Sequence, residues 1–310
     1  MNIHEIYRKV IPAKLKNKLW SWNRQVKIIF QYLPSHLKVW INYTLHNKDQ
    51  FENKLIAAVV LGNEASYIQE WIEYHKLIGI EKFIVYDHES TDNIKEVLQP
   101  YIESGEVVYS YWPGDYKKIQ PAAYNDAIKK YRNKAEWIAF IDVDEFIVPC
   151  SQDTILEVID EIEKDLGKTI PGLAIHWVQY GHSGIYNKPD GLVIEHYIKH
   201  DGINPHVKSI VNPRMVVYYD IHNALFLFGI PARNEKGTAI WEGAVRTPSD
   251  TGCEKIRINH YYTKSFEDWI RKNAIYNLKP VFDPDYMSHQ EEHIMDKYVP
   301  KLKSILNIKN

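Results

Sequence analysis

The segment Asp142-Val143-Asp144-Glu145 holds the residues best suited to chemistry in this sequence. In an extended chain, residues i and i+2 point to the same side, so the spacing predicts that Asp142 and Asp144 face one point. Neither aspartate has a lysine or arginine beside it in the sequence. Hard divalent cations such as Mn²⁺ or Mg²⁺ bind carboxylate oxygens and can in turn neutralise a diphosphate. We therefore predict that Asp142 and Asp144 hold a metal ion.

An α/β fold is predicted around this motif, and that setting separates a metal site from a chance surface turn. The run 55–61 is continuously apolar, as in a strand buried on both faces, and the run 137–141 leads directly into the aspartates. Further strands are predicted at 83–86 and 106–111, with helical periodicity in 68–78, 94–101, 121–132 and 155–162. Alternating strands and helices indicate a mostly parallel central sheet flanked by helices.

Polar residues follow three of these strands, at 63–64, 87–92 and 142–145. Parallel sheets of this kind bind ligands at the carboxyl ends of their strands. We therefore expect the three polar clusters to converge on one crevice.

The second half of the chain has a different pattern. Short β-like runs, separated by Gly, Pro and Asn, occur at 173–178, 192–198, 207–211 and 215–219, and helical periodicity returns from Ser265. We predict a catalytic region at 51–310, with a nucleotide-sugar half at about 55–150 and an acceptor half at about 151–280. Residues 1–50 are predicted to form a basic amphipathic arm.

From about Leu55 to about Asn273, the sequence resembles a bacterial glycosyltransferase family that is related to the family 2 enzymes and similar to glycosyltransferase family 92. The matching motifs are Val60-Leu61-x-Asn63-Glu64, Glu70-Trp71, Tyr74-His75, Gly79, Tyr86-Asp87, Ser90-Thr91-Asp92-Asn93, Tyr124-Asn125-Asp126-Ala127, Trp137 to Ile147, Lys208-Ser209-Ile210-Val211, His222 and His260-Tyr261-x-x-Lys264-Ser265. The segment Tyr180-Gly181-His182-Ser183-Gly184 departs from the family pattern in the placing of its His and Gly. The motifs are specific only in combination.

The resemblance implies the A-type glycosyltransferase fold, Mn²⁺ or Mg²⁺, and a nucleoside-diphosphate sugar as donor, with a UDP-hexose as first guess. It also implies transfer to a glycan or lipid-linked acceptor in surface polysaccharide synthesis. By position, Asn63, Glu64 and Asp87 would contact the nucleoside, although helix capping and turn formation are alternative roles. His260 matches the place of a further metal ligand, and Lys208 could bind donor phosphate as a point charge.

The sequence does not identify a single general base. An inverting transfer needs a carboxylate or a His to take the proton of the acceptor hydroxyl. Asp220 and Glu242 lie in the region expected to face the acceptor, and Glu195 is a further candidate. Spacing does not choose between them, and a surface position is the commoner role for any single acidic residue.

Charge is concentrated at the N-terminus. Residues 1–50 contain nine basic and two acidic residues, a difference of +7, interleaved with apolar residues that include Trp20, Trp22 and Trp40. Such a segment can lie on an anionic membrane surface, or it can pack on the main domain or on a partner. No apolar run approaches 18 residues, and two cysteines fit a reducing compartment. We expect a cytoplasmic protein, peripheral on the inner face of the membrane if the arm docks there.

Other functions fit these features less well. Nucleotidyltransferases that activate sugars usually carry a Gly-rich loop after the first strand, where this chain has only Gly62. The 14 His form no H-E-x-x-H motif of a zinc hydrolase. Basic residues cluster only in the arm, which argues against nucleic-acid binding. A non-catalytic carbohydrate-binding or membrane-docking protein is a further alternative, and release of nucleoside diphosphate from a nucleotide sugar would count against it.

Overall fold

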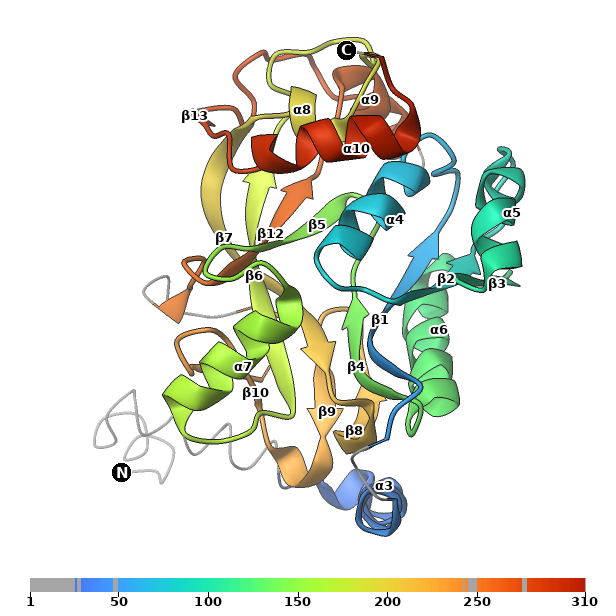
Figure 1. Ribbon diagram of the computed structural model, residues 1–310, viewed down its shortest axis with the longest axis vertical. Helices are drawn as coiled ribbons and strands as arrows, with labels where there is room; N and C mark the ends of the chain where they lie inside the picture. The colour runs from blue at the N-terminus through green and yellow to red at the C-terminus, as the bar shows by residue number, and fades with distance from the viewer. Residues whose placement is uncertain are drawn as a thin grey trace, which may run out of the picture.

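The computed structural model describes residue 26 and residues 29–46, 50–241, 243–244, 250–274 and 278–309. Figure 1 shows a twisted sheet through the middle of the molecule, with α3 below it and α9 and α10 above it. The helices are α3 (Leu33–Leu45), α4 (Ile68–Leu77), α5 (Ile94–Ser104), α6 (Tyr116–Tyr131), α7 (Ile155–Leu166), α8 (Val193–His196), α9 (Phe266–Ala274) and α10 (Val299–Leu306), and the 3₁₀ helices are η1 (Pro213–Met215), η2 (Leu227–Gly229) and η4 (Asp296–Tyr298).

The strands form one large sheet and one small one. They are β1 (Asn53–Leu61), β2 (Lys82–Asp87), β3 (Val107–Tyr111), β4 (Ala135–Phe140), β5 (Glu145–Pro149), β6 (Gly172–Tyr180), β7 (Lys199–Val211), β8 (Val216–Tyr219), β9 (Ala224–Phe226), β10 (Ala232–Arg233), β11 (Ala239–Ile240), β12 (Ile256–Tyr261) and β13 (Gln290–Glu291). The large sheet runs in the order β11-β10-β6-β7-β4-β1-β2-β3, and β12 joins β6 to β5.

The part of the sheet formed by β1 to β4 is parallel. Strand β1 pairs in parallel with β2 on one side and with β4 on the other, and β3 continues in parallel from β2. Strand β7 then pairs antiparallel with both β4 and β6. These pairings bring the carboxyl ends of β1, β2 and β4 to one edge and confirm the predicted α/β fold.

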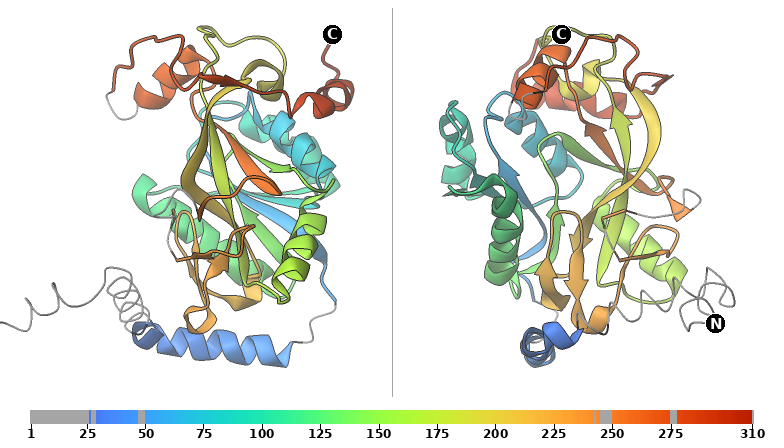
Figure 2. Two further views of the ribbon diagram at one scale, coloured as in Figure 1. Left: turned by 90° about the vertical axis from the view of Figure 1, so that its left-hand side faces the viewer. Right: turned by 180° about the vertical axis from the view of Figure 1, so that it is seen from behind.

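Both faces of the sheet are covered, because successive residues of β1 point to opposite sides. Leu55, Ala57 and Val59 belong to an apolar core shared with α4, α5 and α7. Ile56 and Ala58 belong to a second core shared with α6 and β8. Figure 2 shows the helices on both sides of the sheet. Because both faces of β1 are covered, the run 55–61 is apolar throughout.

The predicted strand at 192–198 is wrong, because this segment contains the short helix α8. The buried carboxylate of Glu70 accepts hydrogen bonds from the N–H groups of Val193 (2.8 Å) and Ile194 (3.1 Å). Free N–H groups at a helix start attract a carboxylate in this way. Since Glu70 lies on α4, far away in the sequence, a tertiary contact overrides the local β pattern.

Helix α3 crosses beneath the sheet, at the end opposite the carboxyl ends of β1 and β2 (Figure 2). It packs against η1, β8 and η2, with His36 and Val39 buried. None of the helices in the described ranges is both long enough and apolar enough to cross a membrane.

Candidate active site

The segment 142–145 forms a tight turn between β4 and β5. The N–H of Glu145 donates to the carbonyl oxygen of Asp142 (3.0 Å), and the N–H of Asp142 donates to Oε2 of Glu145 (2.9 Å). The prediction that this segment is extended is therefore wrong. Asp142 and Asp144 do lie at the carboxyl edge of the sheet, but each faces its own set of side chains.

Asp142 is held mainly by Lys208, which reaches it from β7. The Nζ of Lys208 lies 2.8 Å from Oδ2 of Asp142, and Oδ1 accepts a hydrogen bond from Gln120 on α6 (2.8 Å). Lys208 is only 1% exposed, so it is not a solvated surface lysine. Burial favours its neutral form, but the carboxylates of Asp142 and Glu145 outweigh burial and raise the pKa of Lys208.

Glu145 is completely buried beneath this pair. Its Oε2 lies 3.8 Å from Nζ of Lys208, while its Oε1 has no hydrogen-bond partner. Burial raises the pKa of Glu145 well above its usual range. The attraction of Lys208 opposes this shift, and the negative charges of Asp142 and Asp144 add to it.

Asp144 faces Lys272 of α9 and His260 of β12. Its Oδ2 lies 2.7 Å from Nζ of Lys272 and 3.6 Å from Nε2 of His260. Burial opposes ionisation of Asp144, but Lys272 and then His260 outweigh it and hold the pKa of the carboxyl well below its usual range. Asp144 is therefore an anion at neutral pH. It lies beside His260, the residue predicted to bind the metal with it.

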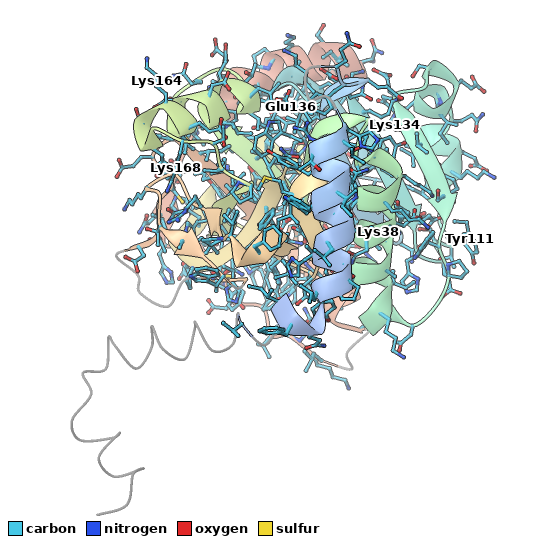
Figure 3. The ribbon with its side chains drawn as sticks, turned by 90° about the horizontal axis from the view of Figure 1, so that it is seen from below. Lys38, Tyr111, Lys134, Glu136, Lys164 and Lys168 are labelled. Atoms are coloured by element: carbon cyan, nitrogen blue, oxygen red, sulfur yellow. The ribbon has the colours of Figure 1, made fainter. Side chains whose placement is uncertain are left out.

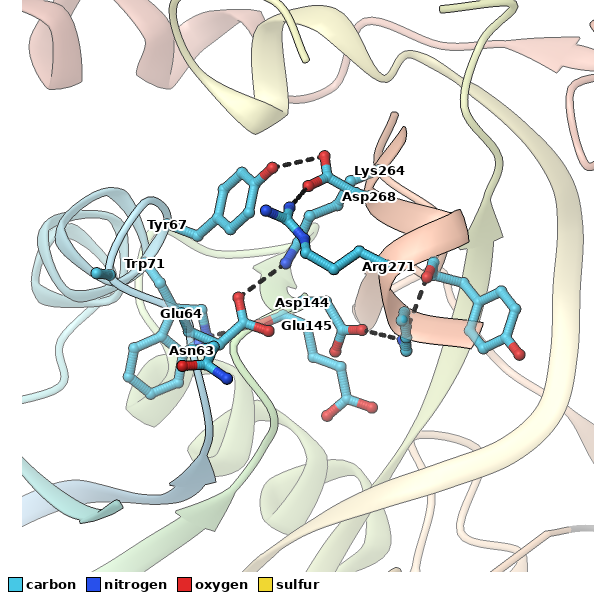
Figure 4. Close-up of polar contacts among 12 residues, drawn as sticks. Asn63, Glu64, Tyr67, Trp71, Asp144, Glu145, Lys264, Asp268 and Arg271 are labelled. Atoms are coloured by element: carbon cyan, nitrogen blue, oxygen red, sulfur yellow. Dashed lines mark hydrogen bonds and ion pairs between the residues drawn. The ribbon is translucent and has the colours of Figure 1, made fainter. Parts of the chain in front are cut away.

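Glu64 extends the cluster from the end of β1. Its Oε2 lies 3.0 Å from Nζ of Lys264, and that ammonium stands 3.9 Å above the ring of Tyr67. Figure 4 shows Glu64, Lys264, Asp144 and Glu145 grouped between α4, the β4–β5 turn and α9. The loops after β1, β4 and β12 therefore meet at one place.

Asn63 and Asp87 shape the neighbouring loops. Asn63 has a positive φ of 60°, and its Oδ1 accepts hydrogen bonds from the N–H groups of Thr91 (2.8 Å) and Asp92 (3.2 Å). Asp87 is 3% exposed and accepts from the N–H of Ser90 (3.0 Å) as well as from a tyrosine hydroxyl of β3. The three predicted polar clusters thus converge, and contact of Asn63 and Asp87 with a nucleoside stays a prediction.

We expect Asp87→Ala to weaken binding of UDP by about 10- to 100-fold, the cost of about 1.5–3 kcal/mol for a lost charged hydrogen bond. The unfolding free energy should fall less than the binding free energy. Calorimetric titration with UDP and urea unfolding measure the two quantities. Asp92→Ala is the matched control, because Asp92 supports the same loop through the N–H of Ala65 (2.9 Å). Unchanged UDP affinity in Asp87→Ala would remove Asp87 from the site.

The candidate bases lie in different settings. Asp220 is exposed in the turn between β8 and β9. Glu242 lies outside the described residues, but the carbonyl of its neighbour Gly243 accepts a hydrogen bond from the N–H of Val207 (2.9 Å), the residue before Lys208. The third candidate, Glu195, is ion-paired with a lysine of α10 at 2.6 Å. Asp220 and Glu242 stay predictions.

Each of the three described ammonium groups of the cluster faces a carboxylate: Lys208 faces Asp142, Lys272 faces Asp144, and Lys264 faces Glu64. Each of these three lysines is therefore already paired before a diphosphate arrives. A divalent cation would supply further positive charge. Among the residues that the structure describes, no three His, Cys, Asp or Glu side chains gather closely enough to hold a metal ion. Asp144, with His260 beside it, nevertheless fits the ion, because Mg²⁺ is commonly held by one or two carboxylates plus phosphates and water.

Sequence reasoning missed two of the three lysines in this cluster as site residues. In the sequence analysis, Lys264 appears only as part of a motif and Lys272 does not appear. Lys272 is 128 residues from its partner Asp144, so sequence spacing carries no signal for the contact. Gln120 was likewise missed, although it lies one helical turn before the inward-facing Tyr124, whose hydroxyl it contacts at 2.9 Å.

Comparison with known proteins places these features in a family. The profile of glycosyltransferase family 92 matches residues 57–299. A family 92 protein of Ricinus communis is 29% identical over 79% of this chain and 41% of its own length. A galactan β-1,4-galactosyltransferase of Arabidopsis thaliana is 31% identical over 39% of this chain and 25% of its own length. A β-1,4-galactosyltransferase of Caenorhabditis elegans is 24% identical over 83% of this chain and 62% of its own length.

The chain spans less than two thirds of each of these relatives. They come from plants and an animal, so they do not support the bacterial membership that the sequence resemblance implied.

Proposed function

Because this chain belongs to glycosyltransferase family 92, we propose that it transfers galactose from UDP-galactose to a glycan and forms a β-1,4 linkage. The β-1,4-galactosyltransferases among its relatives support the choice of sugar and linkage. Within the structure, the proposal is carried by the cluster around Asp144, where acidic, basic and imidazole groups meet at the carboxyl edge of the sheet. This is the edge at which α/β sheets bind nucleotides.

In this proposal, Asp144 and His260 hold Mn²⁺ or Mg²⁺. Asp142 faces the donor beside them, and its predicted role as a metal ligand stays a prediction. When bound, the ion offsets the negative charge of the diphosphate, both in the donor and in the departing UDP. The buried Lys208 fixes Asp142 in position through their 2.8 Å contact. Lys272 is 42% exposed and sits on a flexible stem, so it can exchange Asp144 for a phosphate oxygen when the ion binds.

Aromatic side chains next to the cluster suit the acceptor. The ring of Trp177 lies 4.5 Å from that of His260, and the exposed ring of His206 stacks on Trp177 at 5.3 Å with an interplanar angle of 20°. His222 meets Trp177 edge-on, and burial lowers the pKa of His222 to about 4, so it is uncharged at neutral pH. Aromatic rings of this kind pack against the C–H faces of sugars.

Variants of the two candidate bases test whether Asp220 or Glu242 takes the proton of the acceptor hydroxyl. UDP-galactose carries an α-linked sugar, so a β product requires inversion, with a base that takes the proton of the acceptor hydroxyl. Removing that base is expected to lower kcat by about 10²–10⁴-fold without weakening UDP binding. Initial rates and calorimetric titration with UDP would compare Asp220→Asn and Glu242→Gln with the wild type. If both variants keep the wild-type kcat, neither residue is the base.

The sugar and linkage are tested by product analysis. The protein is incubated with Mn²⁺, a β-1,4-galactan oligosaccharide and one of a panel of UDP-sugars, GDP-sugars and dTDP-sugars. We expect extension only with UDP-galactose and a new β-1,4 linkage in the NMR spectrum of the product. Extension from a different nucleotide sugar, or through a different linkage, would refute this part of the proposal and leave the family assignment intact.

A further inference from the structure

The outer face of α3 is apolar, although it points away from the protein. Its exposed side chains and their exposed fractions are Phe30 (71%, just before the helix), Leu33 (38%), Leu37 (45%), Trp40 (46%), Ile41 (49%) and Leu45 (74%). At roughly 100° per residue, these side chains form one stripe. The stripe lies on the side of the helix away from His36 and Val39, which are buried against the body of the protein. We call the six residues the α3 stripe.

Two neighbouring residues enlarge this apolar surface. Phe228 (46% exposed) and Ile230 (44% exposed) follow β9, and the ring of Phe228 stacks on that of His36 at 5.9 Å. The N–H of Phe228 also donates to Nδ1 of His36 (3.2 Å). These contacts fix α3 on the catalytic body, so the α3 stripe is presented by a docked helix.

The surface around α3 is rich in lysine. Figure 3 looks directly onto α3 and shows Lys38, Lys134, Lys164 and Lys168 on this side of the molecule, with Glu136 among them. Lys134 is ion-paired to a glutamate at 3.3 Å. No Asp or Glu occurs in residues 29–46, and residues 1–50 together carry a charge difference of +7.

We propose that the α3 stripe docks on an anionic lipid bilayer. Apolar and aromatic side chains of an interfacial helix enter the boundary between head groups and acyl chains, while lysines beside them attract anionic lipids. A second copy of this chain is the competing occupant. A symmetric contact through the α3 stripe would bring the two lysine-rich surfaces together, and their repulsion disfavours that dimer.

Docking through α3 also sets the position of the active site. Helix α3 lies at the amino end of β1, whereas Glu64 and the carboxylate cluster lie beyond its carboxyl end (Figure 2). Nine residues of β1 span roughly 30 Å at about 3.3 Å each. If the proposed function holds, the site therefore faces away from the bilayer and would act on the distal end of a long glycan.

Flotation of the full chain with vesicles tests the docking without any need for catalysis. Vesicles of phosphatidylcholine alone are compared with vesicles containing about one third phosphatidylserine. We expect flotation only with the anionic vesicles and release at high salt. The variant Leu37→Glu/Trp40→Glu should reduce the bound fraction at least tenfold. Val281→Glu is the matched control, because Val281 is apolar and 82% exposed but follows α9, at the other end of the molecule, and this variant should bind as wild type.

Folding and association are checked on the same samples. Circular dichroism and UDP binding should be unchanged in both variants, because the substituted side chains are exposed. Failure of the wild type to float with anionic vesicles overturns the proposal. So does a dimer, seen by analytical ultracentrifugation, that Leu37→Glu/Trp40→Glu dissociates, since it would assign the α3 stripe to a second copy.

Discussion

Replacing Asp144 by Asn should lower kcat/KM by about 1000-fold while leaving the fold intact. Asn keeps the shape of the side chain but removes the charge that faces Lys272 and His260. A bound metal contributes several kcal/mol to charge stabilisation, and each 1.36 kcal/mol corresponds to a factor of ten in rate. Steady-state rates with UDP-galactose measure the loss, and circular dichroism checks the fold.

The matched control for this variant is Asp165→Asn. Asp165 also forms an ion pair with a lysine, Lys255, but the pair lies on the surface beside α7. Its removal should change kcat/KM by less than about twofold, because exposed pairs contribute about 0–1 kcal/mol and this one is remote from the site. Asp144→Asn with more than a tenth of the wild-type activity would show that Asp144 is not a ligand of an essential metal.

Replacing Lys208 by Ala should destabilise the protein by about 3–5 kcal/mol, because it leaves the buried Glu145 and the partly exposed Asp142 without their counter-ion. Lys208 is 1% exposed and faces both Asp142 and Glu145. Lys208→Met keeps most of the side-chain volume, so it separates the loss of charge from the loss of packing. Urea unfolding at pH 7 measures the difference.

The effect of Lys208→Ala should shrink as the pH falls through the raised pKa of Glu145, because a protonated Glu145 no longer needs an ammonium partner. The surface lysine Lys255 provides the control, since Lys255→Ala removes a partly exposed ion pair and should cost at most about 1 kcal/mol. If Lys208→Ala unfolds within about 1 kcal/mol of the wild type, Lys208 does not stabilise the buried acids.

The sequence was sufficient to predict the edge of the sheet at which the site lies. A fully buried strand must be apolar along its whole length, so the runs 55–61 and 137–141 located β1 and β4. Polar residues after such strands lie at the same edge of the sheet. Glu64 and Asp144 are indeed close together there, beside Lys264 and α9. The place of His260 beside Asp144 came from the family resemblance.

The charge balance of the site could not be predicted from local sequence. Asp142 has no basic neighbour along the chain, yet the partner of its carboxylate, Lys208, is 66 residues away. An ion pair across a sheet depends on strand order, which adjacent residues do not encode. The helix α8 illustrates the same limit, because its N-terminus is held by Glu70 of α4.

The most direct test of a metal-dependent nucleotide-sugar site at Asp144 is calorimetric titration of the wild-type protein with UDP, in Mn²⁺ and then in EDTA. The account predicts binding that weakens at least about 100-fold in EDTA, the ratio that corresponds to about 3 kcal/mol. In Asp144→Asn, the same addition of Mn²⁺ should have little effect. Equal UDP affinity with and without the ion in the wild type would contradict the account, because the three lysines would then suffice for the diphosphate.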